Sequence, residues 1–199
     1  MHPVNLKIFR LAYWLVRLRW YAILGIVIAY FTAIHFLHIT IWGLPVYIIV
    51  LFLIILNIAS FSFLKYLQRS NVRKSLRIVT LIINFQISTD LIVLTFLLHY
   101  SGGVENPFIV FYIFHMIIGS IILSNIESIL QTSFGLMLLG AMTFLEYTGI
   151  IKHYPLEGFI VTNMYNNLTY LVSTGLIFIS TSYFMLILRQ LTTDESLFT

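Results

Sequence analysis

The sequence predicts an all-α polytopic membrane protein, a bundle of six transmembrane helices preceded by an interfacial amphipathic helix. Two observations support this prediction. Hydrophobic residues make up 60% of the 199 residues and charged residues only 9%, against about a quarter in soluble domains. The apolar residues also lie in continuous runs rather than in alternation, which favours spanning helices over strands. A soluble fold and a disordered chain are both excluded by this composition.

The elements follow from the lengths of the apolar runs, because a spanning helix needs about 20 mostly apolar residues. The predicted spans cover about residues 20–37, 42–64, 78–100, 107–124, 129–151 and 167–188. Residues 1–19 form an N-terminal segment whose basic amphipathic pattern over 4–19 is typical of a helix in the membrane interface. We therefore expect three regions: this helix, a six-helix domain over 20–189 and a polar tail over 190–199.

The basic residues predict the orientation. With six spans, 10 of the 11 lysines and arginines fall on one side of the membrane, and Lys152 is the exception. Positive residues are enriched in cytoplasmic segments, so both termini are expected in the cytoplasm. The protein itself is expected in the inner (plasma) membrane. The net charge of +4 is explained by these clusters, and no nucleic-acid partner is expected. The absence of cysteine excludes disulfides and thiolate metal sites.

Several ionisable residues fall within the predicted spans, where each is costly unless satisfied. His115 and Glu146 lie in the outer halves of consecutive spans, which favours a polar pocket open to the outside. Independent hydrogen bonds between helices are the alternative interpretation. For Gln86 and Asp90 a structural pairing is favoured over a proton relay. The outer rim carries His99, Glu105 and His153, and the first span ends at His35 and His38.

The third predicted span has polar residues on two faces, so it should lie centrally. Its polar stripe at helical period consists of Asn84, Ser88, Thr95 and His99. On the fifth span, Gln131, Gly135, Met142 and Glu146 share a face. Glycines in the fourth and fifth spans would permit close approach of helices.

The connection between the third and fourth spans has the most specific pattern, Ser-Gly-Gly-Val-Glu-Asn-Pro-Phe over residues 101–108. Gly102 and Gly103 permit a tight turn with positive φ. Asn106 suits a helix N-cap and Pro107 the first helical position. The free N–H groups of such a helix start can receive an oxygen with negative charge, and the ring of Phe108 can stack on a flat ligand. A well-capped turn without a ligand is the simpler interpretation.

The pattern Gly-Gly-x-x-Asn-Pro-Phe resembles the heptapeptide of RegB-type (PrrB-type) redox-sensing membrane histidine kinases. In that family it lies in an outward loop between the third and fourth of six transmembrane helices and is implicated in binding ubiquinone. The matching residues are Gly102, Gly103, Asn106, Pro107 and Phe108. The Arg-Leu-Arg-Trp stretch over 17–20 and Asp90 in the third span are further points of similarity.

The resemblance implies the sensor module of a two-component histidine kinase that binds a quinone, ubiquinone or menaquinone, and signals through the sixth span. The implied site consists of Gly102, Gly103, Glu105, Asn106, Pro107, Phe108, Tyr112, His115 and Glu146, with Gln86, Asp90 and His99 as buried polar or coupling residues. Asn106 and the helix-start N–H groups would hold a quinone carbonyl, and Phe108 and Tyr112 would flank its ring. Membrane lipid, a second copy of the chain, a cytoplasmic kinase domain and a response regulator are the implied partners.

The sequence also departs from the family. The family's redox-active cysteine is absent, and no kinase domain follows residue 189, so this chain is not expected to phosphorylate anything by itself. Two other classes stay open. The outer histidines suit a membrane subunit that binds a haem or a metal ion. A small transporter is the third class, although no inverted repeat is evident.

Overall fold

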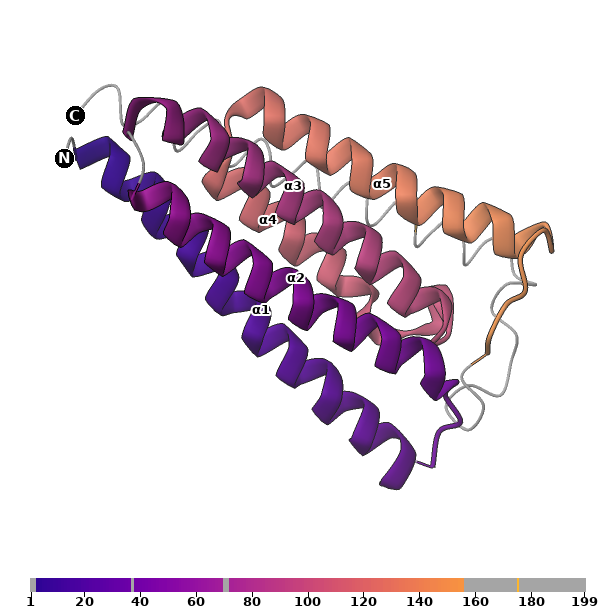
Figure 1. Ribbon diagram of the computed structural model, residues 1–199. Coiled ribbons are helices and arrows are strands. Elements are labelled where there is room, and N and C mark those ends of the chain that lie inside the picture. The colour runs from indigo at the N-terminus through magenta and orange to yellow at the C-terminus, as the bar shows by residue number, and fades with distance from the viewer. Residues whose placement is uncertain (1–2, 37, 70–71, 156–174, 176–199) are drawn as a thin grey trace, which may run out of the picture. The chain divides into compact units, whose positions relative to one another are not determined.

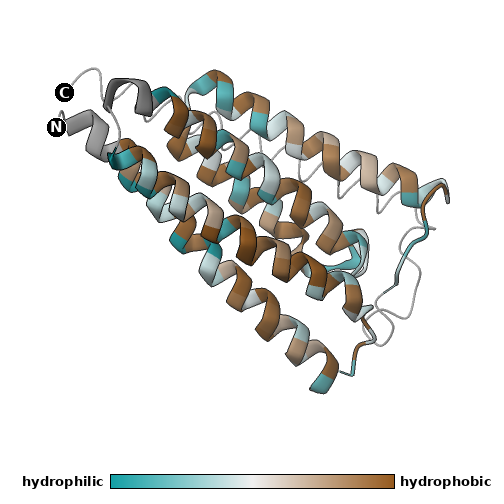
Figure 2. Cartoon of the chain, in the orientation of Figure 1, coloured by the Kyte–Doolittle hydropathy of each residue, from teal (hydrophilic) through white to brown (hydrophobic). Residues whose placement is uncertain are grey.

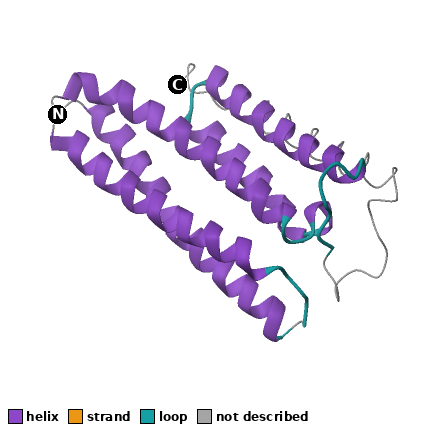
Figure 3. Ribbon diagram, turned by 45° about the vertical axis from the view of Figure 1, so that its right-hand side comes forward, coloured by secondary structure: helices purple, strands orange, loops and turns teal. Residues whose placement is uncertain are grey.

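The structure is a computed structural model that describes residues 3–36, 38–69, 72–155 and 175, with side chains from residue 8 onward except those of 70–76. The described chain is helical, with loops between the helices and no strand (Figure 3). Its long helices are α1 (Pro3–His35), α2 (Gly43–Arg69), α3 (Val72–His99), α4 (Phe111–Ile122) and α5 (Asn125–Tyr147) (Figure 1). Two short 3₁₀ helices, η1 (Gly103–Glu105) and η2 (Pro107–Val110), lie between α3 and α4.

Within the described residues, four helices are long and apolar enough to cross a membrane. They cover Ile8–His35, Gly43–Arg69, Arg77–His99 and Asn125–Tyr147. Hydrophobic residues predominate along α2, as Figure 2 shows. The chain is therefore a membrane protein by the length and composition of its helices. The predicted sixth span, 167–188, lies outside the described residues apart from Gly175.

Two predicted boundaries differ from the structure at the N-terminus and at the fourth span. Residues 3–35 form one continuous helix, so a separate interfacial helix over 4–19 is not confirmed. The predicted fourth span corresponds to the shorter apolar segment Pro107–Ile122, built from η2 and α4, which is not among these four helices, so a fourth span here is not confirmed. At the rises of 3₁₀ and α helices it is about 26 Å long, close to the thickness of a thin bilayer core.

The chain divides into two compact units, Met1–Gln86 and Ile87–Thr199. In the first unit, α1 and α2 form an antiparallel pair. Tyr13 Oη donates to Gln68 Oε1 near one end (3.1 Å), and the rings of Tyr30 and Tyr47 meet edge to face near the other. This pairing places the basic residues of early α1 and late α2 at the same end.

The middle of the α1–α2 pair contains a buried polar contact that the sequence analysis did not predict. Asn57 is fully buried, and its Nδ2 donates to the carbonyl oxygen of Val16 (3.0 Å). Arg19 is only 4% exposed and donates from Nη1 to Asn57 Oδ1 (3.4 Å). Arg19 was predicted to mark the cytoplasmic side and forms part of the Arg-Leu-Arg-Trp stretch of the resemblance. In the structure its buried guanidinium needs a hydrogen-bond acceptor, and Asn57 on α2 supplies one. Arg19 therefore also links α1 to α2.

The second unit consists of the last half of α3 with η1, η2, α4 and α5. Ser88 hydrogen-bonds Gln131 (3.2 and 2.8 Å) and His99 hydrogen-bonds Glu146, so residue numbers rise together along α3 and α5. These two helices are therefore parallel. Thr95 Oγ1 lies 2.6 Å from Tyr112 Oη on α4, which runs in the opposite direction. The Ser88, Thr95 and His99 part of the predicted polar stripe thus contacts both neighbouring helices.

The α4–α5 connection is tighter than the sequence analysis predicted. Leu123 is extended, and Ser124 caps α5 with its hydroxyl while Glu127 accepts a hydrogen bond from the backbone N–H of Ser124 (3.0 Å). This reciprocal arrangement is a capping box. It starts α5 four residues before the predicted position of 129. The Ser-x-x-Glu spacing was the signal that could have located this start.

Candidate functional site

The Gly102–Phe108 loop forms the turn that its sequence predicts. Gly102 and Gly103 have φ values of 107° and 56°, in the left-handed region where a side chain is disfavoured. The backbone N–H of Ser101 donates to the carbonyl of Leu98 (2.9 Å), and that of Glu105 donates to Gly102 (3.0 Å). Residues 101–106 are all buried, which is unusual for a connection. The loop is therefore a fixed part of the second unit.

Asn106 is the centre of the hydrogen-bond network in this loop. Its Oδ1 accepts from the backbone N–H of Phe108 (2.9 Å), and its Nδ2 donates to the Ser101 carbonyl and to Ser101 Oγ (2.7 Å each). The next N–H, that of Ile109, donates to the carbonyl of Asn106 (3.0 Å). The amide of Asn106 and these helix-start N–H groups are thus used within the loop. This differs from their predicted role as the groups that hold a quinone carbonyl.

We expect Asn106→Ala to lower the free energy of unfolding by about 2 kcal/mol, because it removes a cap and leaves the buried Ser101 and the backbone N–H of Phe108 without this partner. Thermal unfolding of the purified protein in detergent measures the effect. Asn125→Ala, at the exposed first position of α5, is the control and should change stability by less than about 0.5 kcal/mol. An equal effect of the two substitutions would contradict this role.

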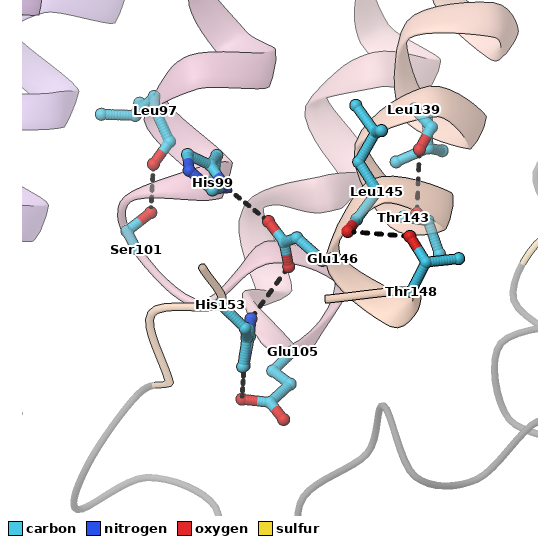
Figure 4. Close-up of polar contacts among 10 residues, drawn as sticks. All are labelled: Leu97, His99, Ser101, Glu105, Leu139, Thr143, Leu145, Glu146, Thr148 and His153. Carbon is cyan, nitrogen blue, oxygen red and sulfur yellow. Dashed lines mark hydrogen bonds and ion pairs between the residues drawn. The ribbon is translucent and has the colours of Figure 1, made fainter. Parts of the chain in front are cut away.

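Next to the loop, two glutamates and two histidines form a connected cluster, which we call the His–Glu cluster (Figure 4): Glu105, Glu146, His99 and His153. Glu146 Oε1 lies 2.6 Å from His99 Nδ1, and Glu146 Oε2 lies 2.8 Å from His153 Nδ1. His153 Nε2 lies 3.5 Å from Glu105 Oε2. The side chain of Glu146 is fully buried, and the two imidazoles are about one-seventh exposed.

The cluster joins four parts of the chain. His99 ends α3, Glu105 ends η1 and Glu146 lies in the last turn of α5. His153 follows α5, after a turn in which Gly149 adopts a φ of 72°. An ionised carboxylate only accepts hydrogen bonds, so the Nδ1 atoms of both histidines carry protons when Glu146 is ionised. The cluster can therefore hold and exchange protons at the loop end of the second unit.

Aromatic rings border the cluster. The rings of His99 and Tyr154 meet edge to face with centroids 5.4 Å apart, and Tyr100 lies 4.8 Å from His99 and 5.4 Å from Tyr154. Lys152 Nζ lies 5.3 Å from the centre of the Tyr154 ring, within cation–π distance. Two tyrosines, which suit a membrane–water boundary, thus lie against the ring of His99.

The other predicted site residues have different surroundings. Tyr112 is fully buried and paired with Thr95, so it is a packing residue of α4. Phe108 is 43% exposed, and its ring starts a row with Phe111 and Phe114 at centroid spacings of 5.7 and 5.6 Å. His115 Nδ1 lies 2.8 Å from the carbonyl oxygen of Phe111 in its own helix. The hydrogen bonds of the cluster do not include His115.

The buried polar residues of α3 are less uniform than predicted. Gln86 is 1% exposed, and both polar atoms of its amide lack a hydrogen-bond partner within the described residues. Asp90 is partly buried. Neither residue belongs to the His–Glu cluster, so the coupling role predicted for them stays a prediction.

His153 of the cluster, and Tyr154 beside it, are residues that the predicted site did not include. His153 was predicted to lie at the outer rim. The turn at Gly149 brings it back onto Glu146, seven residues earlier. A glycine between an acidic residue and a histidine after the end of a helix was the available signal, but it does not determine where the chain turns.

Among the described residues, no group of three or more histidine, aspartate or glutamate side chains has the geometry to hold a metal ion. Glu146 uses its two oxygens on different histidines, and His153 directs its two nitrogens to different carboxylates, so the polar atoms form a chain rather than a shell.

No protein-family model, curated protein or solved structure matches this chain.

Proposed function

We propose that this chain is a membrane-embedded sensor module that binds a quinone beside the Gly102–Phe108 loop. One observation carries the proposal. The loop that resembles the quinone loop of RegB-type kinases contributes Glu105 to a cluster of two carboxylates and two imidazoles. Reduction of a quinone takes up two protons with two electrons. Groups that exchange protons beside the loop therefore suit a ligand whose chemistry moves protons.

Access from the membrane supports a lipophilic ligand. Phe108, Phe111 and Phe114 are each between 41% and 51% exposed and form a row along the start of the fourth span. Quinones with isoprenoid tails dissolve in the bilayer and can reach such a row without entering water. The flat quinone ring can stack on a phenyl ring in the offset arrangement that aromatic pairs prefer.

The polar contact to the ligand is assigned to His99. Its Nδ1 is held by Glu146, which fixes the orientation of the ring as a carboxylate does for metal-bound histidines. Its Nε2 has no hydrogen-bond partner within the described residues, and its side chain is 14% exposed. A protonated Nε2 would donate to a quinone oxygen, with Tyr100 and Tyr154 beside the ring. This replaces Asn106 as the residue that binds the carbonyl.

The redox response follows from the different hydrogen bonds of the two ligand forms. A quinone oxygen only accepts, whereas a quinol hydroxyl also donates. The site then favours one form of the ligand. Binding of that form shifts the equilibrium between two helix packings of the protein, by no more than the difference in the ligand's affinity for the two packings. Because α3 and α5 both end in the cluster, their relative position is the property that a ligand would change.

The proposed orientation places the cluster on the outer side of the membrane. Arg77 lies at the start of the third span and His99 at its other end. In the first unit, Arg10 lies at the same end as Lys65 and Arg69, and basic ends are typically cytoplasmic. The signal would pass to a cytoplasmic kinase domain and its response regulator, in a homodimer.

We expect saturable binding of a short-chain ubiquinone or menaquinone to the purified protein in nanodiscs, measured by calorimetry. His99→Gln and Phe108→Ala should each weaken the affinity about tenfold or more, which corresponds to about 1.4 kcal/mol. Phe52→Ala is the matched control, because Phe52 is 46% exposed and lies on α2. No saturable binding, or the same loss of affinity in Phe52→Ala, would overturn the proposal.

A further inference from the structure

His153 lies between two carboxylates that belong to different parts of the second unit. Its Nδ1 lies 2.8 Å from Glu146 Oε2 at the end of α5, and its Nε2 lies 3.5 Å from Glu105 Oε2 in the Gly102–Phe108 loop. The side chains of Glu146 and Glu105 are 0% and 3% exposed, and that of His153 is 15% exposed. The imidazole is therefore a bridge between the loop and the segment 148–155.

The number of protons on His153 decides whether this bridge is attractive. A neutral imidazole has one N–H, and the hydrogen bond to Glu146 places it on Nδ1. The lone pair of Nε2 then faces a carboxylate oxygen of Glu105, which is repulsive. A second proton on Nε2 converts the contact into an ion pair with Glu105. The lone pair of Nε2 then no longer faces the carboxylate oxygen of Glu105.

Within the part of the chain that the structure describes, the charged and titratable groups that the contacts place around His153 are Glu105 from η1, Glu146 from α5, His99 from α3, and Lys152 and Tyr154 from its own segment. His99 binds the other oxygen of Glu146, and Lys152 Nζ lies over the Tyr154 ring. Within this set, His153 is the cationic group in contact with both carboxylates.

We propose that His153 is a protonation site that ties the segment 148–155 to the Gly102–Phe108 loop when it carries two protons and releases the loop when it loses one. The ligand of this site is the proton of the compartment that the loop faces. The tie needs no quinone, so it can regulate the outer end of the second unit independently of the function proposed above.

The direction of the pH dependence follows from the surroundings of His153. Burial acts to lower its pKa, but the hydrogen bond to Glu146 and the charges of Glu146 and Glu105 outweigh burial, so the pKa is raised above its ordinary value. A group whose pKa is raised by folding stabilises the folded state fully below its unfolded pKa, about 6.5 for histidine. That stabilisation is lost as the pH rises through the folded pKa. The tie is therefore closed in acid and opens toward alkaline pH.

The chain has no cysteine, so a spin-label pair can test the tie in the full protein in nanodiscs. Ile150→Cys and Ile121→Cys provide label sites that are each 68% exposed, one in the tied segment and one at the far end of α4. At about pH 5 we expect one narrow distance distribution. At about pH 9, well above the ordinary pKa of histidine, we expect a broad second population.

Glu105→Gln is the decisive variant. A glutamine amide can donate to a neutral Nε2, so the variant should keep the narrow distribution at both pH values, and the pKa of His153 followed by NMR should fall. His35→Gln, which replaces an exposed histidine at the end of α1, should retain the wild-type pH response. The proposal is overturned if the wild-type distances do not depend on pH, if the dependence persists in Glu105→Gln, or if His153 titrates at the same pH in both proteins.

Discussion

Replacement of Glu146 by alanine should destabilise the protein by about 3 kcal/mol, the cost typical of removing one partner from a buried ion pair. The reason is that Glu146 contacts both His99 and His153, with a side chain that is fully buried. Without it, two mostly buried imidazoles lose the acceptor for their Nδ1 protons. Unfolding by increasing mole fractions of SDS in mixed micelles measures the loss. Glu146→Gln should retain one hydrogen bond and show an intermediate loss.

Glu127→Gln is the matched control for this prediction. Glu127 lies at the opposite end of α5, where its carboxylate accepts from Ser124 in the capping box. The amide oxygen of glutamine can accept the same hydrogen bond, so the change should stay within about 0.5 kcal/mol. If Glu146→Ala changes the free energy of unfolding as little as this control does, the His–Glu cluster contributes little to stability. Because Glu146→Gln should still fold, quinone affinity measured on this variant shows the effect of Glu146 on binding separately from its effect on stability.

The parts of the fold that could be predicted from the sequence are those determined by local chemistry. The runs of apolar residues located α2, α3 and α5 because spanning length is set by the bilayer. Gly102, Gly103 and Asn106 predicted the turn before the fourth span because positive φ and capping depend on residue type. The continuation of α1 back to Pro3 was missed, since basic residues at a predicted interface indicated a separate helix.

The candidate site was harder to predict because its members meet through tertiary contacts. Glu146 and His99 were both named, but their pairing depends on the parallel course of α3 and α5. His153 reaches Glu146 only because the chain turns at Gly149, which no helical periodicity indicates. Asn106 caps η2 as predicted, and this capping side chain, which also binds Ser101, has its polar atoms already in use.

Gly135→Ile should produce the other large effect, because it introduces a large side chain where α5 packs closely against α4 and α3. A Cβ at Gly135 would lie 3.1 Å from Met116 Cε on α4 and 3.4 Å from Leu91 Cδ2 on α3. The methionine end can move by the few tenths of an ångström that alanine needs, so Gly135→Ala should cost little. The larger isoleucine must separate α5 from both helices, and we expect about 3 kcal/mol of destabilisation.

The consequence of this separation reaches the site. Gly135 lies between the Ser88–Gln131 and His99–Glu146 contacts along the parallel helices, so moving α5 away from α3 strains both pairs. Gly135→Ile should therefore also weaken quinone binding, measured by calorimetry, whereas Gly135→Ala should not. Gly140→Ile is the control on the same helix, because a Cβ there meets nothing within 4 Å. It replaces a poor helix former at an exposed position and should leave stability unchanged or slightly higher. Equal effects at the two glycines would show that the α3–α5 contact does not depend on the small residue at 135.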